Sequence, residues 1–477
     1  MFARAAAAAE PRTSMPAMPS PGSRRTLRRG LVAVAVLLLA LVGTVAALLL
    51  HSPGNVSHPS LSFTRTVPGP PPKRPAPFEW PRYGYDAGRT RFFPGGRGLN
   101  PPLRTGWTFN DGTLLEFPPV IYGNTLYLVD DDGSAKAIDK RTGRLLWQNK
   151  VGSLAAASPA IGLHQGLVFV PLLSVNPHAG QNPGNGRLVA LRMRTGKIAW
   201  SHLVPPGTES SPIVWDATVY FGDQNGTVSA LRARDGHVNW TYHASQAVKG
   251  GPAYAHGILY FGDYAGRAYA LDARTGREVW AVSTNGAHFG LGSGNFYSTP
   301  AVAFGRVYMG NTDHSVYSFA ERSGQVAWST STGDYVYASP AVADTPGLGP
   351  TVYIGSYDGN MYAFNARSGA VRWTHGAGGK ISGSPTIVNG VIYFSALGSK
   401  TTQGLDARTG RKVFSFPDGA FNPVVADPGA IYLAGYTTLY QMLPRRPAPT
   451  ATPNRLDGAP PSLGSTTNNK TPQNRRK

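Results

Sequence analysis

Few side chains in this sequence could do chemistry in a recognisable pattern. There is no cysteine, which removes thiol nucleophiles, disulfides, cysteine-based zinc sites and a lipidated N-terminal cysteine. Asp130, Asp131 and Asp132 precede Gly133, but three consecutive acids lack the spacing of a calcium loop and indicate a β-turn. Histidines occur singly, and no Ser/His/Asp order, phosphate-binding loop or dinucleotide fingerprint is evident. Any functional site must therefore come from side chains that the fold brings together.

An eleven-residue pattern recurs seven times and predicts that fold. It reads ALDARTGREVW at Ala270 to Trp280, and in every copy a glycine precedes the final aromatic residue by four positions, as expected of a turn that needs a positive φ. Around this copy, residues 250–280 predict four strands, at 252–254, 258–262, 268–272 and 277–280. Such a short-stranded unit must stack on copies of itself. The seven aromatic positions are Trp147, Trp200, Trp240, Trp280, Trp328, Trp373 and Phe414.

This pattern resembles the tryptophan-docking repeat of quinoprotein-type β-propellers, written A-x-D-x-x-T-G-x-x-x-W. The resemblance covers residues 79–444 and implies an all-β, eight-bladed propeller. In that family the tryptophan of one blade lies against the alanine and the turn glycine of a neighbour. Ser318 and Gly404 replace the alanine here, and Phe414 replaces the tryptophan. We expect those blades to be held less tightly.

The eighth blade is predicted from two incomplete pieces. Trp107 precedes the first full repeat, and residues 422–443 supply inner strands but end before an outer tryptophan strand. Pairing the first and last strands of the domain joins these pieces and removes the open edges of the ring. A seven-bladed ring with a loose N-terminal arm is the alternative.

The candidate binding face is predicted from loop lengths and from the ring order. Two insertions, residues 174–186 and 285–297, are expected on one face. They contain Asn176, His178, His288 and Phe289. The residue two positions before each inner strand should line the channel mouth, and Glu209 and Lys249, on adjacent blades, could pair there. The pair is either purely structural or part of a small-molecule or peptide pocket. The candidate channel-mouth residues are Glu116, Glu209, Lys249, Tyr297 and Tyr337.

Quinoprotein dehydrogenases, which the repeat resembles, use pyrroloquinoline quinone (PQQ) near a vicinal cysteine pair, a calcium ion with acid and amide ligands, and a catalytic aspartate. This chain has no cysteine, and its insertion at 174–186 has no acid. The predicted mouth offers only two acids, one of them beside a lysine. We therefore expect no catalytic residue, cofactor or metal, with a PQQ- and calcium-dependent dehydrogenase of alcohols or sugars as the alternative.

The N-terminal region predicts a membrane anchor. Residues 31–50 carry no charge and are long enough, as a helix, to cross a bilayer core. Arginines crowd the preceding residues 1–30, so the positive-inside rule places the N-terminus in the cytoplasm and the propeller outside. A cleaved signal peptide is the alternative. Residues 51–78 read as a Pro-rich linker, and residues 1–30 and 445–477 as disordered basic tails.

The charge distribution argues against nucleic acid as a partner. Of the formal charge of +20, residues 1–30, 51–78 and 445–477 together carry +14, so little belongs to the propeller. We expect a membrane-anchored, extracytoplasmic binding or scaffold module for a protein, peptide or envelope-polymer partner. Within its class it is similar to the propeller lipoprotein of the outer-membrane barrel assembly machine. An extracytoplasmic ligand-sensing module is a further alternative.

Overall fold

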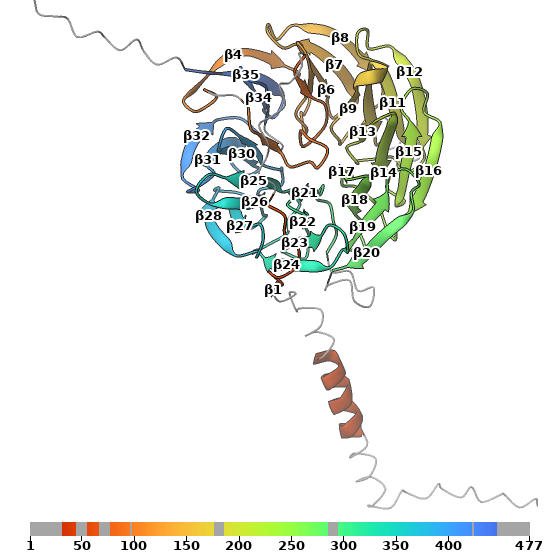
Figure 1. The fold of residues 1–477 in the computed structure, drawn as a ribbon, viewed down its shortest axis with the longest axis vertical. Coiled ribbons are helices and arrows are strands. Elements are labelled where there is room, and N and C mark those ends of the chain that lie inside the picture. Colours follow the sequence, from red (N-terminus) through yellow and green to blue (C-terminus); the bar gives the residue numbers. More distant parts are fainter. Residues whose placement is uncertain are drawn as a thin grey trace, which may run out of the picture. The chain divides into compact units, whose positions relative to one another are not determined.

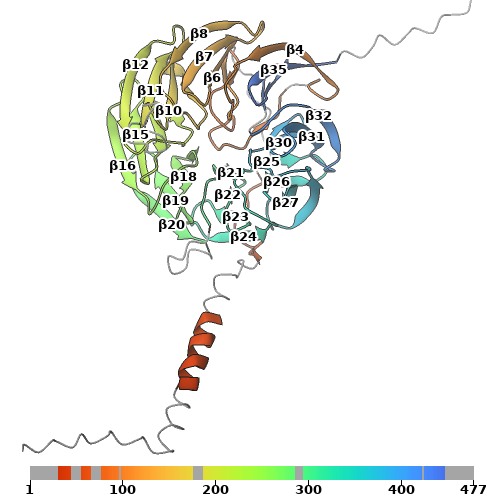
Figure 2. The same ribbon diagram turned by 180° about the vertical axis from the view of Figure 1, so that it is seen from behind.

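A computed structural model describes residues 31–43, 55–65, 77–95, 98–175, 186–284, 294–421 and 424–445. Eight sheets stand around a central channel, as Figure 1 shows face-on and Figure 2 from behind. This confirms the predicted all-β, eight-bladed propeller. The four strands predicted for residues 250–280 are β17 to β20 of blade 4, displaced by at most three residues at any end.

Each of the first four blades contains four antiparallel strands, numbered from the channel outward. Blade 1 contains β5 (Val120–Tyr122), β6 (Thr125–Val129), β7 (Ser134–Asp139) and β8 (Leu145–Lys150). Blade 2 contains β9 (Ala160–Gly162), β10 (Leu167–Leu172), β11 (Gly186–Arg192) and β12 (Ile198–Val204), with a 3₁₀ turn η1 (Leu163–Gln165). Blade 3 contains β13 (Ile213–Trp215), β14 (Thr218–Gly222), β15 (Thr227–Arg232) and β16 (Val238–His243). Blade 4 contains β17 (Ala253–Ala255), β18 (Ile258–Gly262), β19 (Arg267–Asp272) and β20 (Glu278–Ser283).

The remaining blades follow the same order, except that blade 8 draws on both ends of the domain. Blade 5 contains β21 (Ala301–Ala303), β22 (Arg306–Gly310), β23 (Ser315–Ala320) and β24 (Val326–Ser331). Blade 6 contains β25 (Ala341–Thr345), β26 (Gly349–Gly355), β27 (Asn360–Asn365) and β28 (Val371–Gly376). Blade 7 contains β29 (Thr386–Val388), β30 (Val391–Ala396), β31 (Thr401–Asp406) and β32 (Lys412–Phe416). Blade 8 contains β33 (Val424–Ala426), β34 (Ile431–Ala434), β35 (Thr438–Pro444) and β4 (Leu103–Asn110).

Blade 8 closes the ring as predicted. The N-terminal strand β4 pairs antiparallel with the last strand β35, from Thr438 opposite Asn110 to Pro444 opposite Leu103. In Figure 1 the orange β4 lies beside the blue β35. Lys140 of blade 1 then bridges to Asp427 of blade 8 at 2.7 Å. The two ends of the domain thus share one sheet, and the ion pair adds a contact between blades 8 and 1.

Each docking tryptophan joins its blade to the next one. The indole Nε1 of Trp240 donates to the Ala273 carbonyl of blade 4 at 3.0 Å. Its ring also covers Gly276, whose φ is +73° and where an added Cβ would lie 2.6 Å from the ring. Only glycine fits this turn. The same pair of contacts is made by Trp107, Trp147, Trp200, Trp280, Trp328 and Trp373.

The small residue of the repeat lies elsewhere than the family pattern implied. Ala270 sits opposite Trp280 on the adjacent strand of the same blade, at a β-bulge, rather than on the neighbouring blade. Phe414 has a different reason for departing from the pattern. The next blade is blade 8, whose third and fourth strands come from opposite ends of the domain, so no turn glycine exists there to dock on. Phe414 keeps only the contact within its own blade, on Tyr393, which the docking tryptophans also make with the equivalent aromatic residue.

The segment before the first blade fills one end of the channel, which sequence reasoning did not predict. We call residues 78–93 the plug. Its β2 (Glu79–Trp80) pairs with β5, and its β3 (Phe92–Phe93) pairs parallel with β29. Between them, plug carbonyls accept hydrogen bonds from inner-strand amides of other blades, such as Pro81 from Ile161 and Gly88 from Val302. These bonds satisfy amides that would otherwise face an open channel.

Arg89 anchors the centre of the plug. Its side chain is fully buried, and its guanidinium donates to the carbonyls of Tyr83, Ser211, Pro212 and Pro252 at 2.7–3.1 Å. Three of these carbonyls belong to other blades, so one side chain joins the plug to blades 3 and 4. Burial lowers the pKa of Arg89, and its accepting carbonyls are what allow a charge in this position.

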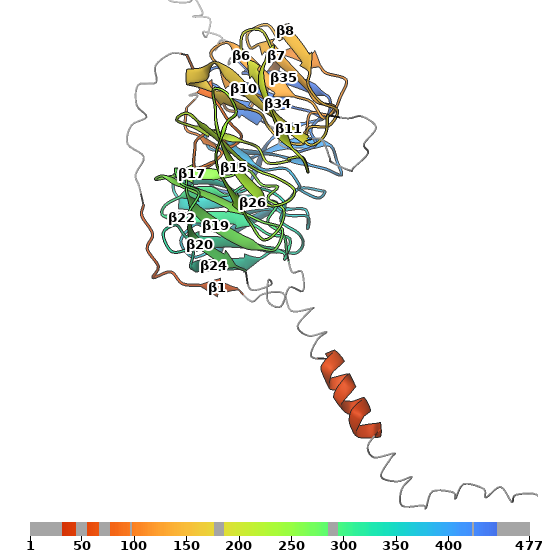
Figure 3. The same cartoon turned by 90° about the vertical axis from the view of Figure 1, so that its right-hand side faces the viewer.

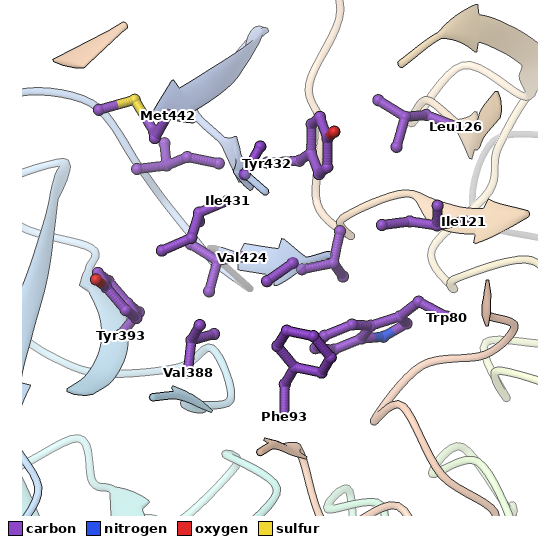
Figure 4. Packing of buried hydrophobic residues seen from close by; sticks show 14 of the residues in the cluster. Trp80, Phe93, Ile121, Leu126, Val388, Tyr393, Val424, Ile431, Tyr432 and Met442 are labelled. Atoms are coloured by element: carbon purple, nitrogen blue, oxygen red, sulfur yellow. The ribbon is translucent and has the colours of Figure 1, made fainter. Parts of the chain in front are cut away.

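Aromatic residues at the two ends of the plug complete the core near the closing blade. Trp80 and Phe93 are buried with ring centroids 5.9 Å apart. Figure 4 shows them beside Val424 of blade 8, Val388 of blade 7 and Ile121 of blade 1. The plug therefore also covers the seam where the ring closes.

Part of the predicted linker packs on the propeller. Residues 55–65, which we call the strap, lie along the rim of blade 5, and β1 (Val56–Ser57) adds a fifth strand to that blade (Figure 3). Residues 51–54 and 66–76 lie outside the described residues, as do the predicted tail at 1–30 and residues 446–477 of the predicted tail at 445–477.

Residues 31–43 form a helix. Across the described ranges, no helix has the length and apolarity needed to cross a membrane. Residues 44–50 of the predicted anchor lie outside the described residues, so the anchor stays a prediction.

The docking geometry predicts unequal effects of two aromatic truncations. Trp280→Ala removes a buried ring and its hydrogen bond to the Glu321 carbonyl, and should lower the free energy of unfolding by about 3–5 kcal/mol. Phe414→Ala should lower it by less, because Phe414 is only half-buried and docks on no turn. Denaturant titration of both variants measures the difference, and equal losses would contradict the docking interpretation.

Arg89→Met should lower the free energy of unfolding by about 3 kcal/mol or more, because it leaves four buried carbonyls without their charged donor. Arg274→Met, at an exposed turn, is the matched control and should change it by less than about 0.5 kcal/mol. Thermal and denaturant unfolding of the two variants tests this. A loss at Arg89 no larger than at Arg274 would show that the plug does not stabilise the ring.

Candidate binding site at the channel mouth

The two faces of the propeller differ. The loops between second and third strands and the connections from blade to blade lie on one face, which we call the mouth face. The hairpins between first and second strands, which we call the first hairpins, lie on the other face together with the tryptophan-docking turns between third and fourth strands. We call this the turn face. The plug pairs with the second and third residues of β5 and β29, counted from the mouth face, and accepts hydrogen bonds from the middle residues of inner strands such as β9, β17 and β21. The channel is therefore closed from the turn face, and a pocket remains at the mouth face.

The pocket is lined by the channel-mouth residues and by residues at the starts of the inner strands. Tyr83 of the plug also lines it. The hydroxyl of Tyr83 donates to Ser384 at 2.7 Å. The lining includes all five predicted channel-mouth residues, Glu116, Glu209, Lys249, Tyr297 and Tyr337, together with Phe117, Ser211, Thr299, Ser339, Ser382, Ser384 and Phe421. The free volume is about 40 Å³, which is room for a few water molecules.

Glu209 is the hub of the pocket. Its carboxylate pairs with Lys249 at 2.9 Å and accepts hydrogen bonds from Gln224 at 2.7 Å and from the Tyr297 hydroxyl at 2.9 Å. The ammonium of Lys249 also lies 4.9 Å from the centre of the Tyr264 ring. The carboxylate of Glu209 and the aromatic ring of Tyr264 thus both hold the ammonium group of Lys249 in place.

An arc of tyrosines continues from this hub across neighbouring blades. The ring of Tyr297 lies edge-on to Tyr337 at 5.8 Å, and Tyr337 lies 4.8 Å from Tyr357. Lys380 lies 5.0 Å from the centre of the Tyr357 ring. The arc offers aromatic faces, hydroxyl groups and ammonium groups along one side of the mouth. These groups can contact flat or apolar parts of a ligand and donate hydrogen bonds to its oxygens.

The carboxyl group of Glu116 has a strongly raised pKa. Burial, followed by the nearby charges of Asp131 and Glu209, raises its pKa to about 7. Burial also raises the pKa of Tyr297, and the charge of Glu209 adds to this effect. At neutral pH the carboxyl group of Glu116 is thus partly protonated. A carboxyl group in this state can donate as well as accept a hydrogen bond.

Sequence reasoning found some residues of the site and missed others that contact them. It identified the position before each inner strand, which gave the five candidates above. It missed Tyr264, Tyr357 and Gln224, which all occupy the second position of a loop between the second and third strands, in DYAG, SYDG and DQNG. That shared loop position was the available signal. Tyr83 carried no such signal because it lies before the repeats.

Four further candidates, Asn176, His178, His288 and Phe289, lie outside the described residues. Their insertions connect strands at the mouth face: β10 to β11 in blade 2, and β20 of blade 4 to β21 of blade 5. A role for these four residues stays a prediction.

The sequence matches a known family over most of the propeller. The model of the family described as outer membrane protein assembly factor BamB matches residues 104–282 and 224–441. The chain belongs to this family. BamB from Moraxella catarrhalis superposes with a TM-score of 0.56 and 17% identity, over 72% of this chain and 98% of that one.

The fold is shared beyond the BamB family. The quinohemoprotein alcohol dehydrogenase from Comamonas testosteroni superposes with a TM-score of 0.61 and 14% identity, over 78% of this chain and 82% of that one. A 1-butanol dehydrogenase (cytochrome c) from Thauera butanivorans is 27% identical over 137 residues. That match covers 26% of this chain and spans 18% of the dehydrogenase's length. At these identities the structures show a common fold and leave the activity open.

The mouth residues do not fit the PQQ and calcium of quinoprotein dehydrogenases. The pocket has room for water rather than for a fused-ring quinone, and Tyr297 and the Glu209–Lys249 pair are among the groups that line it. Within the described part of the chain, no group of three or more His, Cys, Asp or Glu residues is arranged to hold a metal ion. A lysine on Glu209 competes with any cation for that carboxylate.

The raised pKa of Glu116 predicts that the free energy of unfolding depends on pH. The pKa is about 7 in the folded protein and 4.5 for an ordinary glutamate. Between these values the folded protein keeps a proton that the unfolded chain has lost, so the free energy of unfolding falls as pH rises from about 4.5 to about 7. Glu116→Gln should remove this loss and be more stable than the parent at pH 8, by up to about 3 kcal/mol.

Denaturant titrations at several pH values between 4.5 and 8 measure this difference. The gain from Glu116→Gln should disappear at the acid end. Asp216→Asn, at an exposed turn, controls for the loss of one negative charge. A gain that is the same at both ends of the range would show that Glu116 is not buried as described.

Proposed function

We propose that this protein is a membrane-anchored, extracytoplasmic propeller that binds a protein, peptide or cell-envelope partner at its mouth face. The observation that carries the proposal is the mouth pocket, where Glu209, Lys249 and the tyrosine arc are held in place above a plugged channel. Membership of the BamB family supports a binding role, since the family is described as an assembly factor.

The anchor is part of the proposal. In the helix over residues 31–43 apolar side chains are exposed on all sides, including Leu37 at 69% and Leu39 at 72%. Side chains of this kind are stable when surrounded by lipid. With arginines before it, this segment would leave the N-terminus in the cytoplasm and the propeller outside.

The pocket favours recognition over catalysis. Its ionisable groups are already paired or hydrogen-bonded, as Glu209 is with Lys249, Gln224 and Tyr297. A shallow, preformed surface of aromatic and charged groups can bind an extended partner without rearrangement. A PQQ-dependent dehydrogenase remains the second candidate function, favoured by the match to the 1-butanol dehydrogenase.

A crosslinking experiment tests the binding proposal. A photo-crosslinking amino acid is placed at Tyr337 in the full-length chain in living cells, with Arg322 on the turn face as the control position. We expect a specific crosslinked species from position 337 and none from position 322. Equal labelling at both positions, or none at either, would contradict a mouth-face partner.

A charge variant sharpens this test. Lys249→Met should reduce the crosslink at position 337 by at least ~10-fold, but it leaves Glu209 buried without its partner. The double variant Glu209→Gln, Lys249→Met removes both charges and should recover stability without recovering the crosslink. Recovery of the crosslink in the double variant would show that the pair acts only through folding.

Calorimetric titration of the full-length chain with PQQ, with and without calcium, separates the two candidate functions. We expect no saturable binding in either case. Tight, calcium-dependent binding would favour the dehydrogenase.

A further inference from the structure

The strap crosses the rim of blade 5 from the mouth face to the turn face. The side chain of Asn55 accepts a hydrogen bond from the Ser331 amide at 2.9 Å, at the mouth-face end of β24. From there β1 runs antiparallel to β24, with Val56 opposite Ser329 and Ser57 opposite Trp328. Because β24 runs toward the mouth face, the strap runs away from it.

The far end of the strap is fixed at the turn face. The ring of Phe63 stacks on Phe304 at 5.6 Å, and Arg65 pairs with Asp344 at 3.0 Å. Phe304 and Asp344 belong to the first hairpins of blades 5 and 6. Between the ends, the fully buried guanidinium of Arg306 donates to the carbonyls of Leu61, at 2.7 Å, and of Ser62. The strap is thus part of the folded propeller and not a free tether.

The position of Asn55 limits how the propeller can sit on a membrane. The inference rests on the proposed anchor, which ends at Leu50. Five residues span at most about 18 Å, so Asn55 must lie within that distance of the bilayer surface. The turn-face end of the strap, at Arg65, lies ten residues further along the chain. The mouth-face corner of blade 5 is therefore held close to the membrane.

That corner presents an aromatic pair, an exposed Tyr335 and a half-buried His314. Tyr335 follows Ser331 by four residues and is 43% exposed, and its ring lies 5.1 Å from the ring of His314. Tyrosine is enriched where membranes meet water, because its ring prefers the headgroup layer and its hydroxyl stays hydrated. Asp334 and Asp358 lie in the same corner and are hydrogen-bonded to the backbone of residues 333–335. Contact between this corner and a membrane would therefore come from burial of the Tyr335 ring in the headgroup layer. It would not come from attraction to anionic lipid.

We propose that the corner formed by His314 and Tyr335 rests in the headgroup layer of the membrane that holds residues 31–50. This contact tilts the propeller, so that blade 5 lies close to the bilayer and the mouth pocket opens along it. A partner bound at the mouth then lies near the membrane surface rather than far from it.

The absence of cysteine makes a direct test possible. Single-cysteine variants of the full-length chain carry an environment-sensitive fluorophore and are reconstituted into phosphatidylcholine vesicles containing headgroup-nitroxide lipids. Tyr335→Cys is the test position. Tyr436→Cys is the matched control, because Tyr436 is 41% exposed on the mouth face of blade 8, three blades away. Arg322→Cys reports on the turn face of blade 5.

We expect the nitroxide lipids to quench the label at position 335 at least twofold more than at 436 or 322, with little change in high salt. Equal quenching at 335 and 436 would mean that the mouth face lies flat on the bilayer and would overturn the tilt. Stronger quenching at 322 would overturn the orientation. No quenching at 335, with a crosslink from that position to an integral membrane protein in cells, would replace the lipid contact by a protein contact.

Alkaline extraction of the same vesicles separates this proposal from the anchor. Release of the chain would overturn the anchor and this inference together. Retention of the chain without preferential quenching at 335 would overturn only the contact at the blade 5 corner.

Discussion

This structure depends on one constraint. The inner edges of eight short strands face one channel, and their backbone groups need hydrogen-bond partners. Amide groups at those edges have no partner within their own blades, and a wide, empty channel would leave them to water. The plug meets this demand by running around the inner edges, with the carbonyls of Ala87, Gly88 and Thr90 accepting from blades 4, 5 and 6 in turn. Arg89 then joins the plug to carbonyls of blades 3 and 4. The ring is held from its centre as well as between neighbouring blades.

The outer parts of the fold were predictable because they repeat. Trp280 and Gly276 recur at a fixed spacing, and their contacts are local or between adjacent blades, so sequence periodicity carries the information. The plug and the strap occur once each and bind residues more than a hundred positions away, so no pattern in the sequence reports them. Phe414 shows the same limit. Its departure from the pattern was visible, but its reason, a neighbouring blade built from both ends of the domain, appeared only in the structure.

The mouth pocket was predicted in part for a related reason. Counting back from each inner strand identifies Glu209 and Lys249 because blade geometry repeats, and the structure brings them to 2.9 Å. Tyr264 and Tyr357 stand at a repeated loop position too, but their convergence on Lys249 and Tyr337 depends on how far each side chain reaches. What such a pocket binds follows from its own side chains and not from the fold, since the same fold also occurs in alcohol dehydrogenases.

The pairing of β4 with β35 places the two ends of the domain in one sheet, more than three hundred residues apart along the chain. Contacts of such long sequence separation form slowly, because a large loop must close before they contribute to stability. As the chain is synthesised from its N-terminus, the strap, the plug and β4 are made before the strands with which they pair. Until β35 arrives, β4 remains an unpaired edge strand able to pair with other chains. The pairing of β4 with β35, rather than the formation of any earlier blade, therefore removes this exposed edge.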